Sequence, residues 1–104
     1  MSDFESFQSL LTSGQVFYVS KPGCPFCVSL ASELTSHSVP FTEYIPKDQD
    51  ETDTIKLHTN MTSFPMLFIG KKLIGGYNDL IHLVMTNQLA TLLETVGIEI
   101  NTDF

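Results

Sequence analysis

The chain has 104 residues, with twelve acidic residues against five lysines and no arginine, and its formal net charge is −7 at pH 7. A surface of this sign repels nucleic-acid phosphates and anionic lipids, so neither is expected as a partner. The length suits a single domain over residues 1–104, and no apolar run approaches the roughly 20 residues that span a bilayer. The N-terminus lacks the basic flank and apolar core of a secretion signal, so a cytoplasmic monomer is expected.

The first half of the chain alternates helix and strand signals. Apolar residues at helical spacing over residues 4–11 predict a helix that ends at a Ser-Gly turn. Residues 15–20, rich in β-branched and aromatic residues, predict a buried strand. A second helix is expected over residues 25–37, where Pro25 suits the first turn because its missing N–H has no partner to lose. Residues 41–45 predict a second strand.

The second half predicts a helix, a hairpin and a closing helical region. A helix is expected over roughly residues 51–60, after a strongly polar stretch. Its expected apolar face consists of Ile55, Leu57 and Met61. Residues 66–69 and 72–74 flank Gly70-Lys71, a two-residue hairpin signal. Residues 78–96 carry enough apolar side chains for one or two further helices.

This order of elements predicts the fold class. A strand–helix–strand unit requires parallel strands joined by a right-handed crossover, whereas a hairpin adds antiparallel strands. We therefore expect an α/β fold with a central mixed four-stranded sheet flanked by helices.

The chain has only two cysteines, Cys24 and Cys27, separated by two residues. A bridge between them would close too small a loop to stabilise the fold much. A structural zinc site usually needs four ligands, and the three histidines have no ligand-like spacing to this pair, so no metal is expected. A C-x-x-C pair between a strand and a helix indicates a redox-active centre.

The position of the pair predicts different roles for the two thiols. Cys24 lies at the N-terminus of the expected helix, where unpaired N–H groups and partial positive charge favour a thiolate. Lys21 adds a nearby positive charge. Cys27 lies one turn into the helix, where it should be shielded and keep a higher pKa. The pattern therefore predicts an exposed nucleophile, Cys24, and a resolving thiol, Cys27.

Three motifs in order carry a resemblance to a known family. They are Lys21 with Cys24-Pro25-Phe26-Cys27, then Ser63-Phe64-Pro65, then Gly75-Gly76-Tyr77-Asn78-Asp79. Over about residues 15–97 the chain resembles the dithiol glutaredoxins of the thioredoxin-like superfamily. The resemblance implies a thioredoxin-like fold and a glutathione-dependent thiol–disulfide oxidoreductase acting through the two cysteines. Two aromatic residues depart from the family pattern: Phe26 replaces the usual tyrosine, and Phe64 replaces the valine of a Thr-Val-Pro loop.

The resemblance also implies a glutathione site. Its expected residues are Lys21, Phe26, Ser63, Phe64, Pro65, Gly76, Tyr77, Asn78 and Asp79. The family's proline in the second motif is cis, so Pro65 is expected to be cis. Asp79 would face the glutathione ammonium group, and Lys21 its glycine carboxylate. Simple helix capping by Asn78 or Asp79 is compatible with this role. Lys56 has no clear match to the arginine or glutamine of the family's third helix, and an ordinary solvated lysine is the simpler interpretation.

The implied partners are glutathione as co-substrate and disulfide-containing or glutathionylated proteins, with ribonucleotide reductase named by resemblance only. Two alternatives stay open. One is a thioredoxin-like electron donor reduced by a flavoprotein reductase, which would not depend on glutathione. The other is a non-catalytic module that binds glutathione or an iron–sulfur cluster, which visible absorbance would reveal. The choice between a monothiol and a dithiol route also stays open.

Overall fold

The computed structural model describes residues 4–98, and side chains from Phe7 onward. The remaining residues of the expected 1–104 domain, including nearly all of the C-terminal tail, lie outside the described range. The elements are α1 (Phe4–Ser13), β1 (Val16–Val19), α2 (Pro25–Ser36), β2 (Thr42–Tyr44), α3 (Gln49–Thr59), β3 (Met66–Ile69), β4 (Lys72–Gly75), α4 (Tyr77–Met85) and α5 (Leu89–Glu94). Within these residues, no helix is long and apolar enough to cross a membrane.

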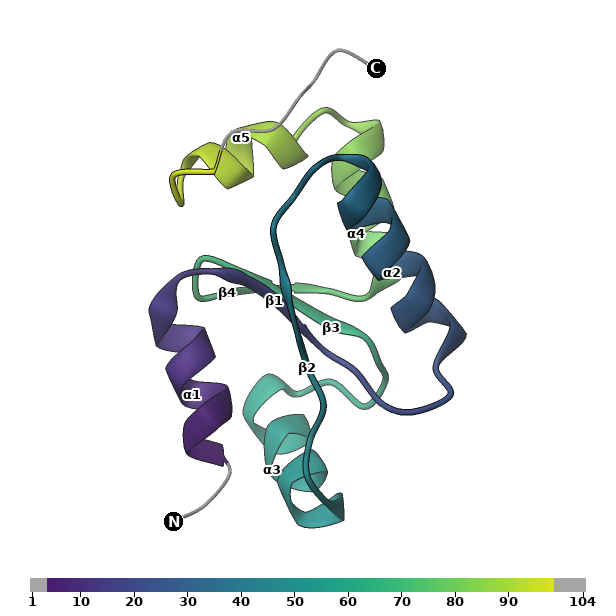
Figure 1. Cartoon of the computed structure of the whole chain (residues 1–104), viewed down its shortest axis with the longest axis vertical. Helices are drawn as coiled ribbons and strands as arrows, with labels where there is room; N and C mark the ends of the chain where they lie inside the picture. The colour runs from purple at the N-terminus through teal and green to yellow at the C-terminus, as the bar shows by residue number, and fades with distance from the viewer. Residues whose placement is uncertain (1–3, 99–104) are drawn as a thin grey trace.

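The four strands form one mixed sheet in the order β2-β1-β3-β4. β1 runs parallel to β2, with Tyr18 opposite Glu43, and antiparallel to β3, with Val19 opposite Met66. β3 and β4 are antiparallel. Figure 1 shows α1 and α3 on one face of the sheet and α2, α4 and α5 on the other. This architecture confirms the predicted mixed sheet flanked by helices.

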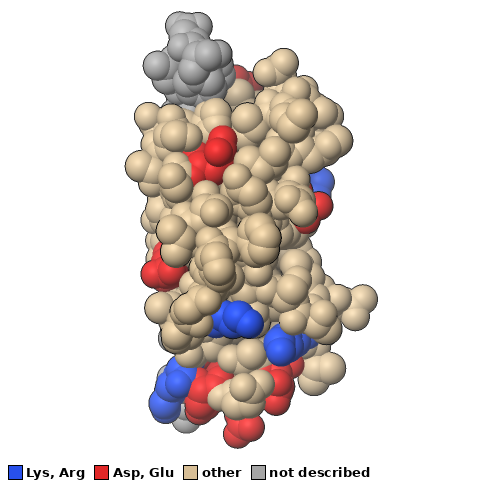
Figure 2. Space-filling model, turned by 90° about the vertical axis from the view of Figure 1, so that its right-hand side faces the viewer, with Lys and Arg blue, Asp and Glu red and all other residues tan. Residues whose placement is uncertain are grey.

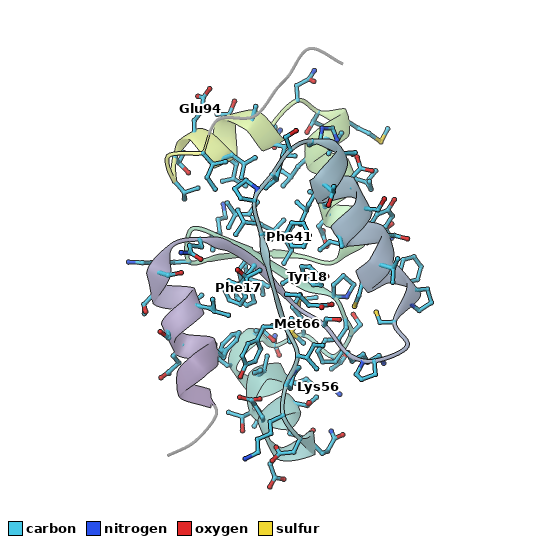
Figure 3. The ribbon with its side chains drawn as sticks, in the orientation of Figure 1. Phe17, Tyr18, Phe41, Lys56, Met66 and Glu94 are labelled. Atoms are coloured by element: carbon cyan, nitrogen blue, oxygen red, sulfur yellow. The ribbon has the colours of Figure 1, made fainter. Side chains whose placement is uncertain are left out.

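Both faces of the sheet are covered, so β1 and β3 are buried along their whole length. On the α1 and α3 face, the Phe17 and Phe68 rings stack with centroids 4.7 Å apart. The Phe7 ring of α1 meets Phe17 edge-on at 5.9 Å. On the opposite face, Tyr18 packs in the cluster that contains both cysteines (Figure 3). Side chains that alternate along β1 therefore serve two separate cores.

Helix α3 begins two residues before the predicted start. Asp48 caps it, because its carboxylate accepts a hydrogen bond of 2.9 Å from the Glu51 N–H. Glu51 is buried and accepts from the Tyr44 hydroxyl at 2.6 Å and the Lys47 N–H at 2.7 Å. The predicted apolar face was wrong at Leu57, whose side chain is 86% exposed. When a short helix is polar and has few apolar residues, its sequence does not determine which side packs against the core.

The hairpin and the closing region follow the prediction more closely. Gly70 and Lys71 both have positive φ, 57° and 75°, as a type I′ turn requires, so the two-residue hairpin is confirmed. The closing region forms two helices, α4 and α5, and α4 begins at Tyr77. Leu80 and Leu93, one from each of these helices, are fully buried against the sheet.

We predict that Phe17→Ala lowers the free energy of unfolding by about 3 to 5 kcal/mol, because it removes a fully buried ring and leaves a cavity. Urea unfolding followed by circular dichroism measures this loss. Leu57→Ala is the control, and its exposed side chain should cost at most about 0.5 kcal/mol. Similar losses in the two variants would contradict the assignment of the core.

Candidate active site

The cysteine pair lies just beyond the C-terminal end of β1, where α2 begins. Gly23 has a φ of +72°, a left-handed conformation that glycine adopts without a steric penalty. Cys24 is the N-cap of α2, and Pro25 follows it in the first turn. The Cys24 Sγ accepts a hydrogen bond from the Cys27 N–H at 3.3 Å. The helix N-terminus thus directs a backbone donor at the Cys24 sulfur.

The expectation of an exposed nucleophile was wrong. Cys24 is a free thiol with only 7% of its surface exposed, and Cys27 is exposed by 3%. Burial of the thiol raises the pKa of Cys27, and its interaction with Cys24 raises it further. Ser20 and the Lys21 backbone act in the opposite direction and lower it. The pKa of Cys27 is therefore raised above that of an ordinary cysteine, in the predicted direction, and a reactant must reach Cys24 through the cavity beside it.

One cavity, called here the cis-proline groove, has a volume of about 320 Å³. Its lining residues are Phe26, Met61, Ser63, Phe64, Pro65, Gly76, Tyr77, Asn78 and Asp79. These include every predicted glutathione-binding residue except Lys21, and they come from three separate parts of the chain. The Phe26 and Tyr77 rings lie 6.0 Å apart, and the Phe64–Pro65 bond is cis, as the resemblance implied. Met61 was not predicted, because it belongs to no motif.

The N-terminus of α4 forms one end of the groove. The N-cap residue of this helix is Gly76, and the Asp79 side chain takes part in the capping, as the simple capping interpretation expected. Asp79 lies in the first turn and accepts a hydrogen bond of 2.8 Å from the Gly76 N–H through Oδ2. Gly75 has a φ of +129°, and a Cβ there would collide with the Asp79 carboxylate, so this position requires glycine.

Two lysines, Lys21 and Lys56, approach the ring of Phe64. The Lys21 Nζ lies 5.6 Å from the ring centroid and the Lys56 Nζ lies 5.9 Å from it, both within the range of a cation–π contact. Lys56 is half-buried on α3, so the expectation of an ordinary solvated lysine was wrong. Figure 2, which views the right-hand side of Figure 1, shows lysine side chains close together in the lower part of the molecule, above a group of acidic side chains.

A second cavity, of about 610 Å³, borders both cysteines and is called here the β2-side cavity. Its wall on the sheet includes Tyr18 and Glu43, whose side chains share a hydrogen bond of 3.1 Å from the phenol to Oε2. Burial and this bond to Glu43 raise the pKa of Tyr18, so the phenol stays a donor at neutral pH. Sequence reasoning missed this pair, although a tyrosine in an otherwise apolar buried strand was a possible signal.

Within the part of the chain that the structure describes, no three His, Cys, Asp or Glu side chains come together in a way that could hold a metal ion.

Comparison with known proteins identifies the family. The family model for glutaredoxin matches residues 16–74. The chain belongs to the glutaredoxin family. It is 32% identical to glutaredoxin-1 of Mus musculus over 96 residues, covering 84% of this chain and 88% of the mouse protein. It is 34% identical to glutaredoxin-1 of Sus scrofa over 98 residues, covering 86% and 91% of the two chains.

Solved structures agree with this assignment. A wheat glutaredoxin superposes with a TM-score of 0.78 at 28% identity, covering 91% of this chain and 96% of the wheat chain. A buckwheat glutaredoxin–glutathione complex has a TM-score of 0.81 at 20% identity, covering 91% and 90%, which shows the shared fold. The thioredoxin-like fold is thus confirmed, and this glutaredoxin is a glutathione-dependent thiol–disulfide oxidoreductase. Nothing in the comparisons favours the flavoprotein-reduced donor or the non-catalytic module.

We predict that Cys27, left alone in a Cys24→Ser variant, is alkylated with a pH midpoint above that of an ordinary cysteine, about 8.5. The physical reason is that burial disfavours the Cys27 thiolate, so the protonated and unreactive thiol persists to higher pH. Rates of iodoacetamide addition from about pH 6 to about pH 10, read by intact mass, measure the midpoint. The same variant unfolded in guanidinium is the control, and a folded midpoint at or below the unfolded one would contradict the prediction.

Proposed function

We propose that the cis-proline groove binds glutathione beside Cys24 and that Cys24 is the nucleophile. The observation that carries this proposal is the convergence of Phe26, the Ser63–Pro65 loop and the Gly76–Asp79 segment on one groove. Glutathione is then the co-substrate, with its sulfur at the end of the groove near the cysteine pair. With a volume of about 320 Å³, the groove has the size of a small-molecule site.

The two ends of glutathione require opposite charges. The free N–H groups at the N-terminus of α4 suit the γ-glutamyl carboxylate. Asp79 suits the ammonium group, because its Oδ1 keeps acceptor capacity while Oδ2 binds the Gly76 N–H. Lys21 and Lys56, which both approach the Phe64 ring, suit the glycine carboxylate. In this arrangement two lysines bind the glycine carboxylate, a role that an arginine would otherwise fill, and the chain has no arginine.

The chemistry follows from the two thiols. The Cys24 thiolate attacks the glutathione sulfur of a mixed disulfide, and the client leaves as a thiolate that takes up a proton. A second glutathione thiolate then attacks the bound glutathione sulfur, which releases glutathione disulfide and restores the Cys24 thiolate. With a client disulfide, Cys27 can instead displace the client sulfur from Cys24, and two glutathione molecules reduce the resulting Cys24–Cys27 bond.

The proposed clients are glutathionylated and disulfide-containing proteins, with ribonucleotide reductase among them by family resemblance. A cytoplasmic, monomeric electron carrier fits this activity, because glutathione keeps dithiols of glutaredoxin potential, roughly −200 to −230 mV, reduced in such a compartment. No metal takes part in the proposed steps.

Replacing each cysteine separates the two routes. Cys24→Ser should abolish reduction of a small glutathione mixed disulfide, because it removes the attacking sulfur, whereas Cys27→Ser should retain the monothiol route. The assay couples glutathione oxidation to glutathione reductase. Wild-type protein without glutathione-dependent turnover would contradict the proposed function, and an active Cys24→Ser variant would contradict the role of Cys24.

Removing the charge of Lys56 tests the glycine end of the site. Lys56→Gln should raise the KM for glutathione about threefold to fivefold with a smaller change in kcat, because an ion pair at a partly exposed site contributes up to about 1 kcal/mol. Lys72→Gln on β4 is the matched control, since Lys72 is exposed and outside the groove. An unchanged KM in Lys56→Gln, or an equal rise in both variants, would exclude Lys56 from the site.

A further inference from the structure

The β2-side cavity borders both cysteines, but the proposed function uses only the cis-proline groove. The sheet order β2-β1-β3-β4 puts β1, which leads to Cys24, between β2 and β3. The cis-proline groove belongs to the β3 and β4 side, because its residues precede β3 and follow β4. The β2-side cavity is lined by Glu43, which belongs to β2, and by Ile45, which follows β2 directly. The two cavities therefore lie toward opposite edges of the sheet relative to β1, and the β2-side cavity is the one that Cys24 and Cys27 line.

Thiol–disulfide exchange at Cys24 needs space on both sides of its sulfur. A thiolate attacks a disulfide sulfur along the line of the breaking bond, so the entering and leaving sulfurs lie opposite each other. When glutathione attacks the Cys24 sulfur of a client–Cys24 disulfide from the cis-proline groove, the client sulfur must depart on the far side. The β2-side cavity is the space that borders Cys24 there.

The side chains of the β2-side cavity define which client it suits. Glu43 is exposed at its wall and is held by the Tyr18 hydroxyl at 3.1 Å. Val28 and Ile45, exposed by 71% and 51%, add apolar surface at its rim. Lys21 also lines the cavity, but its Nζ lies against the Phe64 ring on the groove side. Of the two charged side chains that line this cavity, Lys21 and Glu43, Glu43 is the one whose charged group does not approach the Phe64 ring.

We propose that the β2-side cavity is the client subsite of this glutaredoxin, and that it prefers disulfides with a basic side chain next to the cysteine, which pairs with Glu43. The inference rests on the proposed function, since it requires glutathione to enter from the cis-proline groove. Glu43 thus acts as a specificity residue, and Tyr18 positions its carboxylate. The net charge of −7 adds a general attraction for basic clients, and Glu43 gives it a defined location.

The step that this subsite serves is balanced. A glutathione thiolate attacks the Cys24 sulfur of the client–Cys24 disulfide, the Cys24–glutathione bond forms, and the client–Cys24 bond breaks. The client leaves as a thiolate through the β2-side cavity and takes a proton from solvent. A second glutathione then restores the Cys24 thiolate and leaves as glutathione disulfide.

The test compares two symmetric disulfide dimers of a short peptide, with either arginine or glutamine next to the cysteine. The arginine-to-glutamine ratio of kcat/KM is divided by the ratio for uncatalysed reduction by glutathione, because arginine also changes thiol reactivity. For wild type the corrected ratio should be about fivefold. It should fall to about one in Glu43→Gln and persist in Glu94→Gln, a matched change on α5 at the far end of the molecule (Figure 3).

A second measurement needs no variant. The wild-type preference should shrink as ionic strength rises to about 1 M, where the screening length falls to about 3 Å. A corrected ratio of about one in wild type, a ratio unchanged in Glu43→Gln, or a preference that resists salt would each overturn the inference. Reduction of the small glutathione mixed disulfide is measured in parallel: a wild type active in that assay but without peptide preference overturns the subsite alone, whereas an inactive one overturns both proposals.

Discussion

The pairing of β1 between β2 and β3 is the constraint on which the active site depends. Because β1 is buried on both faces, its register is held by two strand ladders and two apolar cores. The strand therefore fixes the position of Cys24 beyond its C-terminal end, where α2 begins. The N-cap position then brings the Cys27 N–H to the Cys24 sulfur without any further side chain.

The same constraint explains why the two thiols differ. Both are buried, but Cys24 is the N-cap of α2 and its sulfur accepts the Cys27 N–H, whereas Cys27 lies one turn inside the helix. Burial without a full set of donors disfavours a thiolate, so the pKa of Cys27 is raised. The proposed nucleophile and the proposed resolving thiol therefore lie within a single turn of helix.

Phe64 shows how one departure from a family pattern changes a site. Its ring extends the apolar surface of the cis-proline groove and contacts the Nζ of both Lys21 and Lys56. A ring face attracts cations through its quadrupole, so two like charges can be held on one side chain with less mutual repulsion than direct contact would produce. In a chain without arginine, this arrangement concentrates positive charge where a carboxylate is proposed to bind.

The sequence by itself determined the local features: the cysteine spacing at a strand–helix junction, the Gly70-Lys71 turn and the alternation of buried strands. These depend on residues a few positions apart, whose periodicity and backbone preferences are visible in a single chain. The proposed glutathione-binding residues were predicted only through the resemblance to a family, and the fold brings all of them except Lys21 together in one groove. Only the fold decided that Leu57 faces solvent, that Cys24 is covered, that Lys56 reaches Phe64, and that Tyr18 meets Glu43. Such contacts join residues distant in sequence, and chain packing, rather than local pattern, brings them together.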